Sequence, residues 1–204
     1  MAYIVVALIS YLIGSIPNGL IIGRTFCNID IRQFGSKNIG ATNAFRVLGV
    51  KPAIAVLVTD AAKGIAGVYL GTYLIGTPIA ELVGGIFAMM GHNWPVFLKF
   101  KGGRGVATGL GVIAMLVPQV TICVFVIWLI IVYLTRYVSL ASIIAALLVP
   151  IGMWLVHVQL EVFWFGMIAA LFVVLRHKPN IERLLKGEEL KIKAGSTKPL
   201  PKKE

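Results

Sequence analysis

Long apolar runs, separated by short segments rich in lysine, arginine and glycine, are the feature that most constrains the fold of this sequence. Runs of roughly 12 to 22 apolar residues have the length that an α-helix needs to enter or cross a bilayer. A transmembrane β-barrel would instead show alternating segments of about 10 residues, and these runs do not alternate. Charged residues make up only 13% of the chain, against about 25% in soluble domains. We therefore predict an all-α polytopic membrane protein.

Six apolar stretches are candidate membrane spans, and one of them is too long for a single crossing. Val106–Leu134 would be roughly 43 Å long as a helix, whereas the hydrocarbon core is about 30 Å thick. Pro118 lies inside this stretch and can end one helix and begin another. We expect two helices there, of which Val106–Val117 is short, and seven transmembrane helices in all. The other expected spans are about Tyr3–Gly23, Pro52–Leu74, Pro78–Leu98, Val138–His157 and Leu160–Leu175.

The distribution of basic residues supports the count of seven. All lysines and arginines except Lys63 fall in Arg24–Lys51, Lys99–Gly105, Thr135–Tyr137 or the tail from Arg176 onward. Basic loops favour the cytoplasm, and only seven crossings place these four segments on one side of the membrane. The prediction is therefore an N-terminus outside and a cytoplasmic C-terminus.

The sequence indicates one domain and a tail. Residues 1–190 are expected to form a single transmembrane domain, because no soluble second domain and no internal repeat is visible. Residues 191–204 are basic and rich in Lys and Pro, and we expect a disordered cytoplasmic tail. The tail is either solvated or in contact with anionic lipid headgroups.

One basic segment, "FGSKNIGATNAFRVLG" (34–49), interleaves positive charge with glycine and small polar residues. Arg46 offers a guanidinium fork, and the other donors come from Ser36, Asn38, Gly40, Thr42 and Asn43. Convergent N–H and hydroxyl donors with a guanidinium are what phosphate recognition requires. We favour a phosphate site here over an ordinary capped loop, which would use the same residue types.

A second basic segment, "FKGGRGVATGLG" (100–111), runs directly into an apolar helix. Lys101 and Arg104 lie among Gly102, Gly103 and Gly105, at a helix N-terminus expected to face the cytoplasm. Free backbone N–H groups at such a terminus favour an anion. The spacing is not that of a Walker A loop. Neither segment carries the carboxylates that magnesium prefers, so we predict no metal.

Two further groups of polar residues stand out. His177 and Asn180 follow the last span and are in turn followed by Glu189, and for His177 a packing role and a catalytic role are equally open. Asp60 and Lys63 are three residues apart inside a span, so they can pair on one helix face. We favour a structural role for this pair, although intramembrane charges are often functional.

Five motifs, in this order along the chain, resemble those of the bacterial membrane-integral glycerol-3-phosphate acyltransferases that use acyl phosphate. They are "GSIPNG", "GSKNIGATNAFR", "DAAKG", "GHNWPVFLKFKGGRGVATGLG" and "HKPNIERLLKGEE". The resemblance covers essentially residues 1–190 and implies a seven-helix fold. It implies transfer of a fatty acyl group from acyl phosphate to the sn-1 hydroxyl of glycerol 3-phosphate, giving lysophosphatidic acid and inorganic phosphate. The expected location is the bacterial cell inner membrane, with the active site on the cytoplasmic side.

The resemblance also implies roles for single residues. Ser36 and Arg46 match the family's essential serine and arginine, His177 and Asn180 match its third motif, and Glu189 matches a structural glutamate. The glycines at 102, 103 and 105 match those that affect glycerol-phosphate binding. Two residues depart from the usual "GSGN" and "GGKG" patterns, namely Lys37 and Arg104.

The chemistry of an acyl phosphate requires no metal, cofactor or coenzyme A, because the acyl group is already activated. Our hypothesis is that the Ser36–Arg46 loop holds the acyl phosphate, and that the Gly102–Gly105 loop holds glycerol 3-phosphate together with Lys101, Ser139 and the His177–Asn180 segment. The proton acceptor is either His177 or a substrate phosphate.

The expected partners are the two substrates, membrane lipids and no nucleic acid, with a functional link to the enzyme that makes acyl phosphate. Two other classes compete with this interpretation. A transporter of an organic phosphate would show paired repeats with broken helices at the bilayer midplane, and no repeat is apparent. A structural membrane subunit with a lipid-binding surface predicts scattered lysines rather than loops of Gly, Ser, Thr and Asn.

Overall fold

The computed structural model describes residues 1–192, which form ten α-helices and two short 3-10 helices, with no strand in that part of the chain. The all-α prediction is therefore confirmed, and residues 193–204 of the expected tail lie outside the described residues. The α-helices are α1 (Ala2–Ser15), α2 (Asn18–Cys27), α3 (Ala41–Leu48), α4 (Val50–Leu74), α5 (Pro78–Asn93), α6 (Val106–Leu116), α7 (Pro118–Thr135), α8 (Val138–Leu155), α9 (Leu160–Arg176) and α10 (Lys178–Leu185); the 3-10 helices are η1 (Ile31–Gln33) and η2 (Val96–Leu98).

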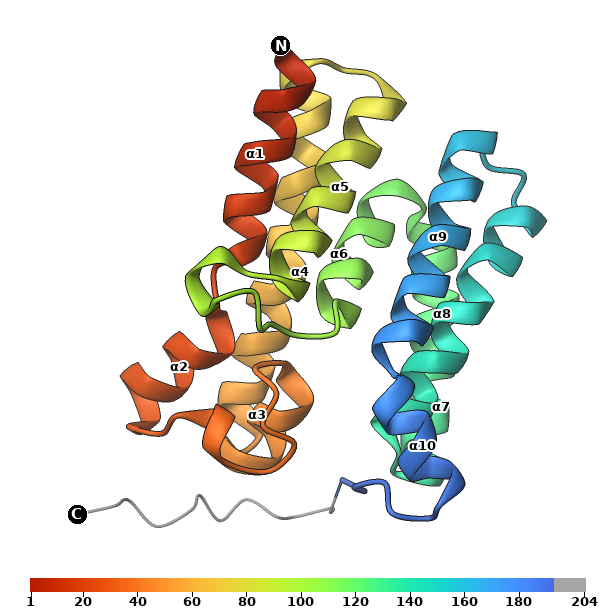
Figure 1. Cartoon of the computed structure of the whole chain (residues 1–204). Helices are drawn as coiled ribbons and strands as arrows, with labels where there is room; N and C mark the ends of the chain where they lie inside the picture. The colour runs from red at the N-terminus through yellow and green to blue at the C-terminus, as the bar shows by residue number, and fades with distance from the viewer. Residues whose placement is uncertain (193–204) are drawn as a thin grey trace.

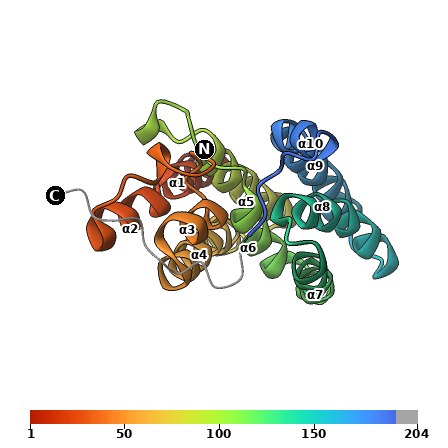
Figure 2. The same ribbon diagram turned by 90° about the horizontal axis from the view of Figure 1, so that it is seen from below.

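The long helices form two groups, and α6 joins them (Figure 1). In the first group α1 packs against α4 and α5, and α4 also contacts α6. In the second group α8 contacts both α7 and α9. Figure 2 shows α6 lying between the two groups when the molecule is seen from below. The space between the groups, at the end where α3 and α10 lie, is where the candidate site is found.

Small residues bring the helices of the first group into backbone contact. A Cβ on Gly84 of α5 would overlap the carbonyl oxygen of Gly67 in α4, and a Cβ on Gly64 would overlap that of Thr108 in α6. Helices in a membrane associate through close van der Waals contact, for which glycine leaves room. These glycines therefore allow the helices of the first group to pack with their backbones in contact.

The helix boundaries follow the prolines of the sequence. α6 ends at Leu116 and α7 begins at Pro118, which confirms the predicted turn. The span expected as Tyr3–Gly23 is two helices, because the chain leaves the helical path at Ile16 and Pro17. The span expected as Pro78–Leu98 was too long: α5 ends at Asn93, two residues before Pro95.

The apolar helices support a multi-pass membrane protein. By length and composition four segments can cross a membrane, namely α1 with α2, α4, α7 and α8, or five when α9 is counted with α10 across a 57° bend. α5 and α6 are shorter, with 16 and 11 residues. Seven crossings, and the sides on which the termini lie, stay a prediction.

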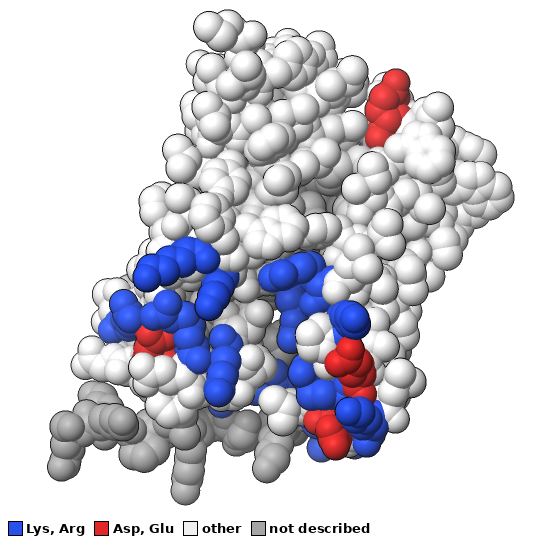
Figure 3. All heavy atoms as spheres, in the orientation of Figure 1, with Lys and Arg blue, Asp and Glu red and all other residues white. Residues whose placement is uncertain are grey.

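Charge is distributed unevenly over the molecule. Figure 3 shows lysine and arginine side chains gathered at the end formed by α2, α3 and α10, while one acidic group lies at the opposite end. The body between them presents almost no charge on this face. Large apolar side chains are exposed elsewhere on the helices as well, as on α7, where Ile122 is 66% and Tyr133 85% exposed. This surface suits contact with lipid.

Candidate active site

A polar cavity lies at the basic end of the molecule, between the two helix groups. Both segments predicted to bind phosphate contribute to its wall, together with α4, α7 and Ile192, the last residue that the structure describes. The predicted site residues that line it are Ser36, Asn38, Gly40, Thr42, Asn43, Arg46, Asp60, Arg104 and Gly105. The structure thus brings together two loops that are about 60 residues apart in the sequence.

Asn43 organises the first of these loops. Its side-chain nitrogen donates to the carbonyl oxygens of Ile31, Phe34 and Asn38 at 2.8–3.2 Å, and its side-chain oxygen accepts from the N–H of Ser36 at 2.8 Å. The side chain is 1% exposed, so the loop encloses it. All of these bonds fix the backbone on which Ser36 and Arg46 are presented to the cavity. We assign to Asn43 the shape of the loop rather than direct contact with a substrate.

The glycines of the second loop are required by its contact with the end of α5. A Cβ on Gly102 would overlap the carbonyl oxygen of His92, and one on Gly103 would overlap the His92 ring. Gly105 has φ +79° and is the N-cap of α6, a backbone conformation that favours glycine. Lys101 is exposed and lies outside the cavity lining. The loop therefore follows His92 closely and delivers Arg104 to the cavity.

Arginine side chains concentrate positive charge around the cavity. Burial is the main cause that lowers the pKa of Arg104 to about 10; Glu189 opposes this shift, and the charges of Arg183, Arg46 and Arg176 add to it. Burial likewise lowers the pKa of Arg46. Both groups remain protonated at neutral pH. An excess of partly buried positive charge is stabilised by a bound anion.

Glu189 anchors the third cluster. Its Oε1 accepts from Ser139 Oγ at 3.0 Å and from Asn180 Nδ2 at 2.7 Å, and its Oε2 accepts from Arg183 Nε at 2.7 Å. Burial alone would raise the pKa of Glu189, but these three hydrogen bonds lower it on balance. The carboxylate is therefore ionised, and it ties α8 to α10, as expected for a structural glutamate.

His177 and Asn180 are buried at the bend between α9 and α10, with exposed fractions of 2% and 1%. Nδ1 of His177 lies 2.8 Å from the carbonyl oxygen of Val173, so Nδ1 carries the proton in the neutral ring. Burial lowers the pKa of His177 to about 4. Neither residue lines the polar cavity, and Ser139 does not either. The third cluster thus lies beside the cavity rather than in its wall.

The segment after α10 connects the third cluster to the first loop. Arg46 Nη2 donates to the carbonyl oxygen of Leu190 at 2.8 Å, directly after Glu189. The N–H of Ile192 donates to the carbonyl oxygen of Arg136 at 2.9 Å. Sequence inspection missed both contacts, because Leu190 and Ile192 are plain apolar residues near the start of a basic tail.

The pair between Asp60 and Lys63 is formed as predicted, and Asp60 lines the polar cavity. Asp60 Oδ1 lies 2.9 Å from Lys63 Nζ and also accepts from Asn18 Nδ2 at 3.2 Å. Lys63 Nζ donates to the carbonyl oxygen of Ile16 at 2.9 Å, where the chain breaks between α1 and α2. His92 lies 3.7 Å from the same carboxylate. The pair therefore satisfies the backbone at a helix break, which supports a structural role.

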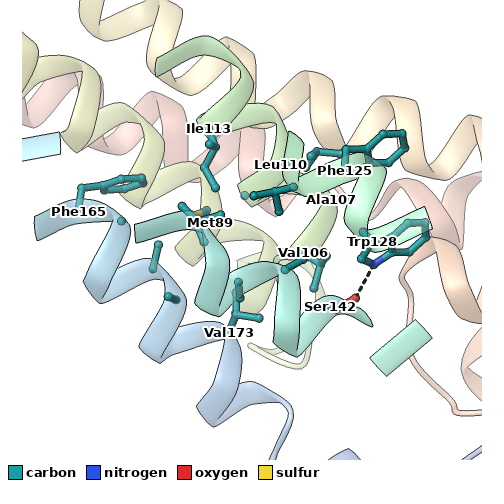
Figure 4. A pocket seen from close by; sticks show the side chains of 18 of the residues that line it. Met89, Val106, Ala107, Leu110, Ile113, Phe125, Trp128, Ser142, Phe165 and Val173 are labelled. Carbon is teal, nitrogen blue, oxygen red and sulfur yellow. Dashed lines mark hydrogen bonds between the residues drawn. The ribbon is translucent and has the colours of Figure 1, made fainter. Parts of the chain in front are cut away.

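A second, apolar cavity adjoins the polar one (Figure 4). Met89, Leu110, Ile113 and Phe165 are among the side chains around it, and they come from α5, α6 and α9. Ser142 accepts a hydrogen bond from Trp128 Nε1 at 3.1 Å, so both polar atoms are paired. The two cavities share four lining residues, which are Leu57, Val106, Ala107 and Trp128. A polar group and an apolar chain of one ligand can thus occupy adjoining spaces.

Comparison with known proteins decides the family. A family described as glycerol-3-phosphate acyltransferase matches residues 4–187. The chain belongs to the glycerol-3-phosphate acyltransferase family. It is 44% identical over 193 residues to the glycerol-3-phosphate acyltransferase of Fusobacterium nucleatum, which covers 95% of this chain and 100% of that protein. It is 49% identical over 189 residues to that of Desulforudis audaxviator, covering 93% and 95% of the two chains.

The fold agrees with the same family. The crystal structure of PlsY (YgiH), an integral membrane glycerol 3-phosphate acyltransferase, in its glycerol 3-phosphate form has a TM-score of 0.89 at 34% identity, covering 95% of this chain and 96% of that one. The lysophosphatidic acid form of PlsY has a TM-score of 0.88. The predicted family is therefore confirmed: this is a PlsY-type membrane acyltransferase of phospholipid biosynthesis.

Proposed function

We propose that this acyltransferase takes its acyl group from acyl phosphate and transfers it to the sn-1 hydroxyl of glycerol 3-phosphate. The sn-1 oxygen attacks the acyl carbon, the bond from that carbon to the phosphate oxygen breaks, and inorganic phosphate leaves. The hydroxyl proton passes to a base. The product is lysophosphatidic acid, and no coenzyme A, metal or cofactor takes part, because acyl phosphate is already activated.

One observation carries this proposal: the two loops expected to bind phosphate line a single polar cavity, and that cavity adjoins an apolar one. Acyl phosphate and glycerol 3-phosphate each bring a phosphate, and only the first brings a long apolar chain. The polar cavity suits the two phosphates, and the apolar cavity suits the chain. PlsY was crystallised in glycerol 3-phosphate and lysophosphatidic acid forms, and this supports the same two ligands here.

We assign the acyl phosphate to the loop from Ser36 to Arg46, whose backbone Asn43 fixes and which lines the polar cavity that adjoins the apolar one. Glycerol 3-phosphate is assigned to the Gly102–Gly105 loop. Lys101, Ser139 and the segment from His177 to Asn180, which lie outside the lining of the polar cavity, are assigned to the same substrate. Arg46 and the N–H groups of the loops then stabilise the oxyanion and the leaving phosphate.

The proton acceptor is His177 or a substrate phosphate. His177 supports the first alternative because its lowered pKa, about 4, keeps the ring neutral at pH 7. Its Nδ1 is directed at Val173, which leaves Nε2 as the acceptor atom. The second alternative needs no protein base, since a phosphate dianion can accept the proton within the complex.

The basic end of the molecule is proposed to face the cytoplasm of a bacterial cell with the chain crossing the inner membrane seven times. The concentration of lysine and arginine at that end supports this orientation. α6 is then a short helix inside the protein, covered by α4 and α7. A functional link to the enzyme that supplies acyl phosphate follows from the choice of donor.

The decisive experiment uses purified protein in lipid vesicles. Release of inorganic phosphate from palmitoyl phosphate is followed with and without glycerol 3-phosphate, and palmitoyl coenzyme A serves as the comparison donor. We expect release that depends on the acceptor, and no transfer from the coenzyme A ester. Equal transfer from palmitoyl coenzyme A would refute the proposed donor, and an acylated sn-2 position in the product would refute the proposed regiochemistry.

A further inference from the structure

The backbone of Gly103 is held by two helix ends from outside its own loop. Its N–H donates to the carbonyl oxygen of His92 at 3.0 Å, so the peptide before Gly103 is fixed by the end of α5. Its carbonyl oxygen accepts from Arg176 Nη2 at 2.7 Å, so the peptide after it is fixed by the end of α9. Since a Cβ would overlap the His92 ring, Gly103 cannot move toward α5.

The bond from Arg176 determines where the next backbone N–H points. In a trans peptide the carbonyl and the following N–H lie in one plane and point in opposite directions. The N–H of Arg104 is therefore directed away from Arg176. Arg104 and Gly105 line the polar cavity. Within residues 1–192 no hydrogen bond takes up the N–H of either residue. They are free donors at the positive end of α6.

Arg176 is itself held in place. Its guanidinium carbon lies 5.6 Å from the ring centroid of Trp94, which is a cation–π contact. Trp94 makes an edge contact with Phe172 at 5.2 Å, and its carbonyl oxygen accepts from Tyr11 at 2.7 Å. Arg176 lies outside the cavity lining, so it does not touch a ligand there. These contacts suit a residue that affects the ligand indirectly, by positioning the backbone of Gly103.

We propose that Arg176 is a positioning residue for the acceptor: by holding the Gly103 carbonyl it presents the N–H groups of Arg104 and Gly105 to the phosphate of glycerol 3-phosphate. The identity of this anion rests on the proposed function. A planar guanidinium can stack on Trp94 and donate at its edge at the same time, whereas an ammonium group is a point charge. Lysine at this position therefore fills the role only in part.

The test compares Arg176→Gln and Arg176→Lys with Lys186→Gln, which removes a positive charge from an exposed residue at the end of α10. Initial rates in vesicles are measured against each substrate. For Arg176→Gln we expect the KM for glycerol 3-phosphate to rise about tenfold or more, with KM for acyl phosphate within about twofold. The KM of Arg176→Lys should fall between those of Arg176→Gln and the wild type, and Lys186→Gln should match the wild type. Millimolar ethylguanidinium should lower the raised KM of Arg176→Ala, and ethylammonium should not.

Each outcome bears on the proposal. Equal rises in both KM values, or the same change in Lys186→Gln, would overturn it in favour of a general loss of structure or charge. An unchanged KM in a folded Arg176→Lys and Arg176→Gln would overturn it as well. If Arg176→Gln does not fold, the proposal is tested by the KM of Arg176→Lys and by the ethylguanidinium rescue of Arg176→Ala. Binding of glycerol 3-phosphate to the wild type is measured by calorimetry without the donor. If the wild type binds glycerol 3-phosphate but transfers no acyl group, the proposed function is refuted. The positioning role is then tested by comparing the affinities of the wild type and the Arg176 variants for glycerol 3-phosphate.

Discussion

Arg46 has a backbone acceptor, the Leu190 carbonyl oxygen at 2.8 Å, and is otherwise turned toward the polar cavity. We predict that Arg46→Ala lowers kcat/KM by roughly 10²–10³, the usual loss when a donor to a developing oxyanion is removed. Arg46→Lys should recover only part of this, because lysine lacks the fork. The assay is phosphate release in vesicles. Lys51→Ala, which removes an exposed charge from the start of α4, is the matched control and should stay within twofold.

The buried imidazole of His177 predicts a dependence of stability on pH. Its pKa in the folded state is about 4, below the ordinary value of 6.5, so the unfolded state binds more protons between these values. Stability is therefore lost as the pH falls from about 6.5 toward 4, and is unaffected by this group above that range. The drop in Tm between pH 7.5 and pH 5 should be smaller in His177→Gln than in the wild type. An equal drop in the two proteins would show that His177 does not titrate in this way.

Single-residue roles were only partly predictable from the sequence. The motif residues Ser36 and Arg46 stand out because charge and small polar groups are rare in an apolar chain. Arg176 and Leu190 could not be found in this way, since their partners lie 73 and 144 positions away. An arginine at the end of an apolar run has many explanations, and a backbone carbonyl leaves no mark in a sequence.

At the scale of helices, the stability of the protein depends on the close contact between α4 and α5, which leaves no room for a larger side chain at Gly84. Gly84→Leu should destabilise the protein by about 1–3 kcal/mol or more, because its side chain would overlap the backbone of Gly67. The measurement is Tm and yield of folded protein in detergent. Gly109→Ala on α6 is the control, since its Cβ would meet only the flexible end of Met89 at 3.3 Å. A Gly84→Leu variant as stable as the control would contradict the helix contact.

The loop between α5 and α6 offers a second test, in which His92→Ala is expected to compensate for Gly103→Ala. Gly103→Ala should raise the KM for glycerol 3-phosphate, because a Cβ would displace the loop from the His92 ring. Removing the ring with His92→Ala in the same chain should restore much of the binding. The two effects are measured as a double-mutant cycle in the vesicle assay. Strict additivity of the two substitutions would mean that the ring does not set the loop position.

Helices were easier to predict than their ends. The turn at Pro118 was predicted from the length of Val106–Leu134, which would overshoot the hydrocarbon core as one helix, together with the proline itself and the distribution of basic residues. The end of α5 was placed five residues too late, at Leu98 instead of Asn93, because apolar Val96 and Phe97 continue the pattern beyond Pro95. Hydropathy does not distinguish a loop lying at the membrane surface from the last turn of a span.

At the scale of the whole molecule, the proposed seven crossings put the two termini on opposite sides of the membrane. Cys27 and Cys123 are first replaced, and single cysteines are introduced as Gln159→Cys and Glu188→Cys, at exposed positions in the α8–α9 loop and after α10. A membrane-impermeant maleimide applied to intact spheroplasts should label the first and spare the second until the membrane is opened. Labelling of both, or of Glu188→Cys alone, would contradict the proposed orientation.

All groups expected to bind phosphate lie at one end of the molecule, and this has a consequence for the membrane as a whole. Substrate headgroups arrive from, and the product headgroup stays on, a single side, so the enzyme never has to carry a phosphate through hydrocarbon. Under the proposed orientation each turnover leaves its lysophosphatidic acid in the inner leaflet and none in the outer. Phospholipids made from this product must therefore reach the outer leaflet by a separate transfer step.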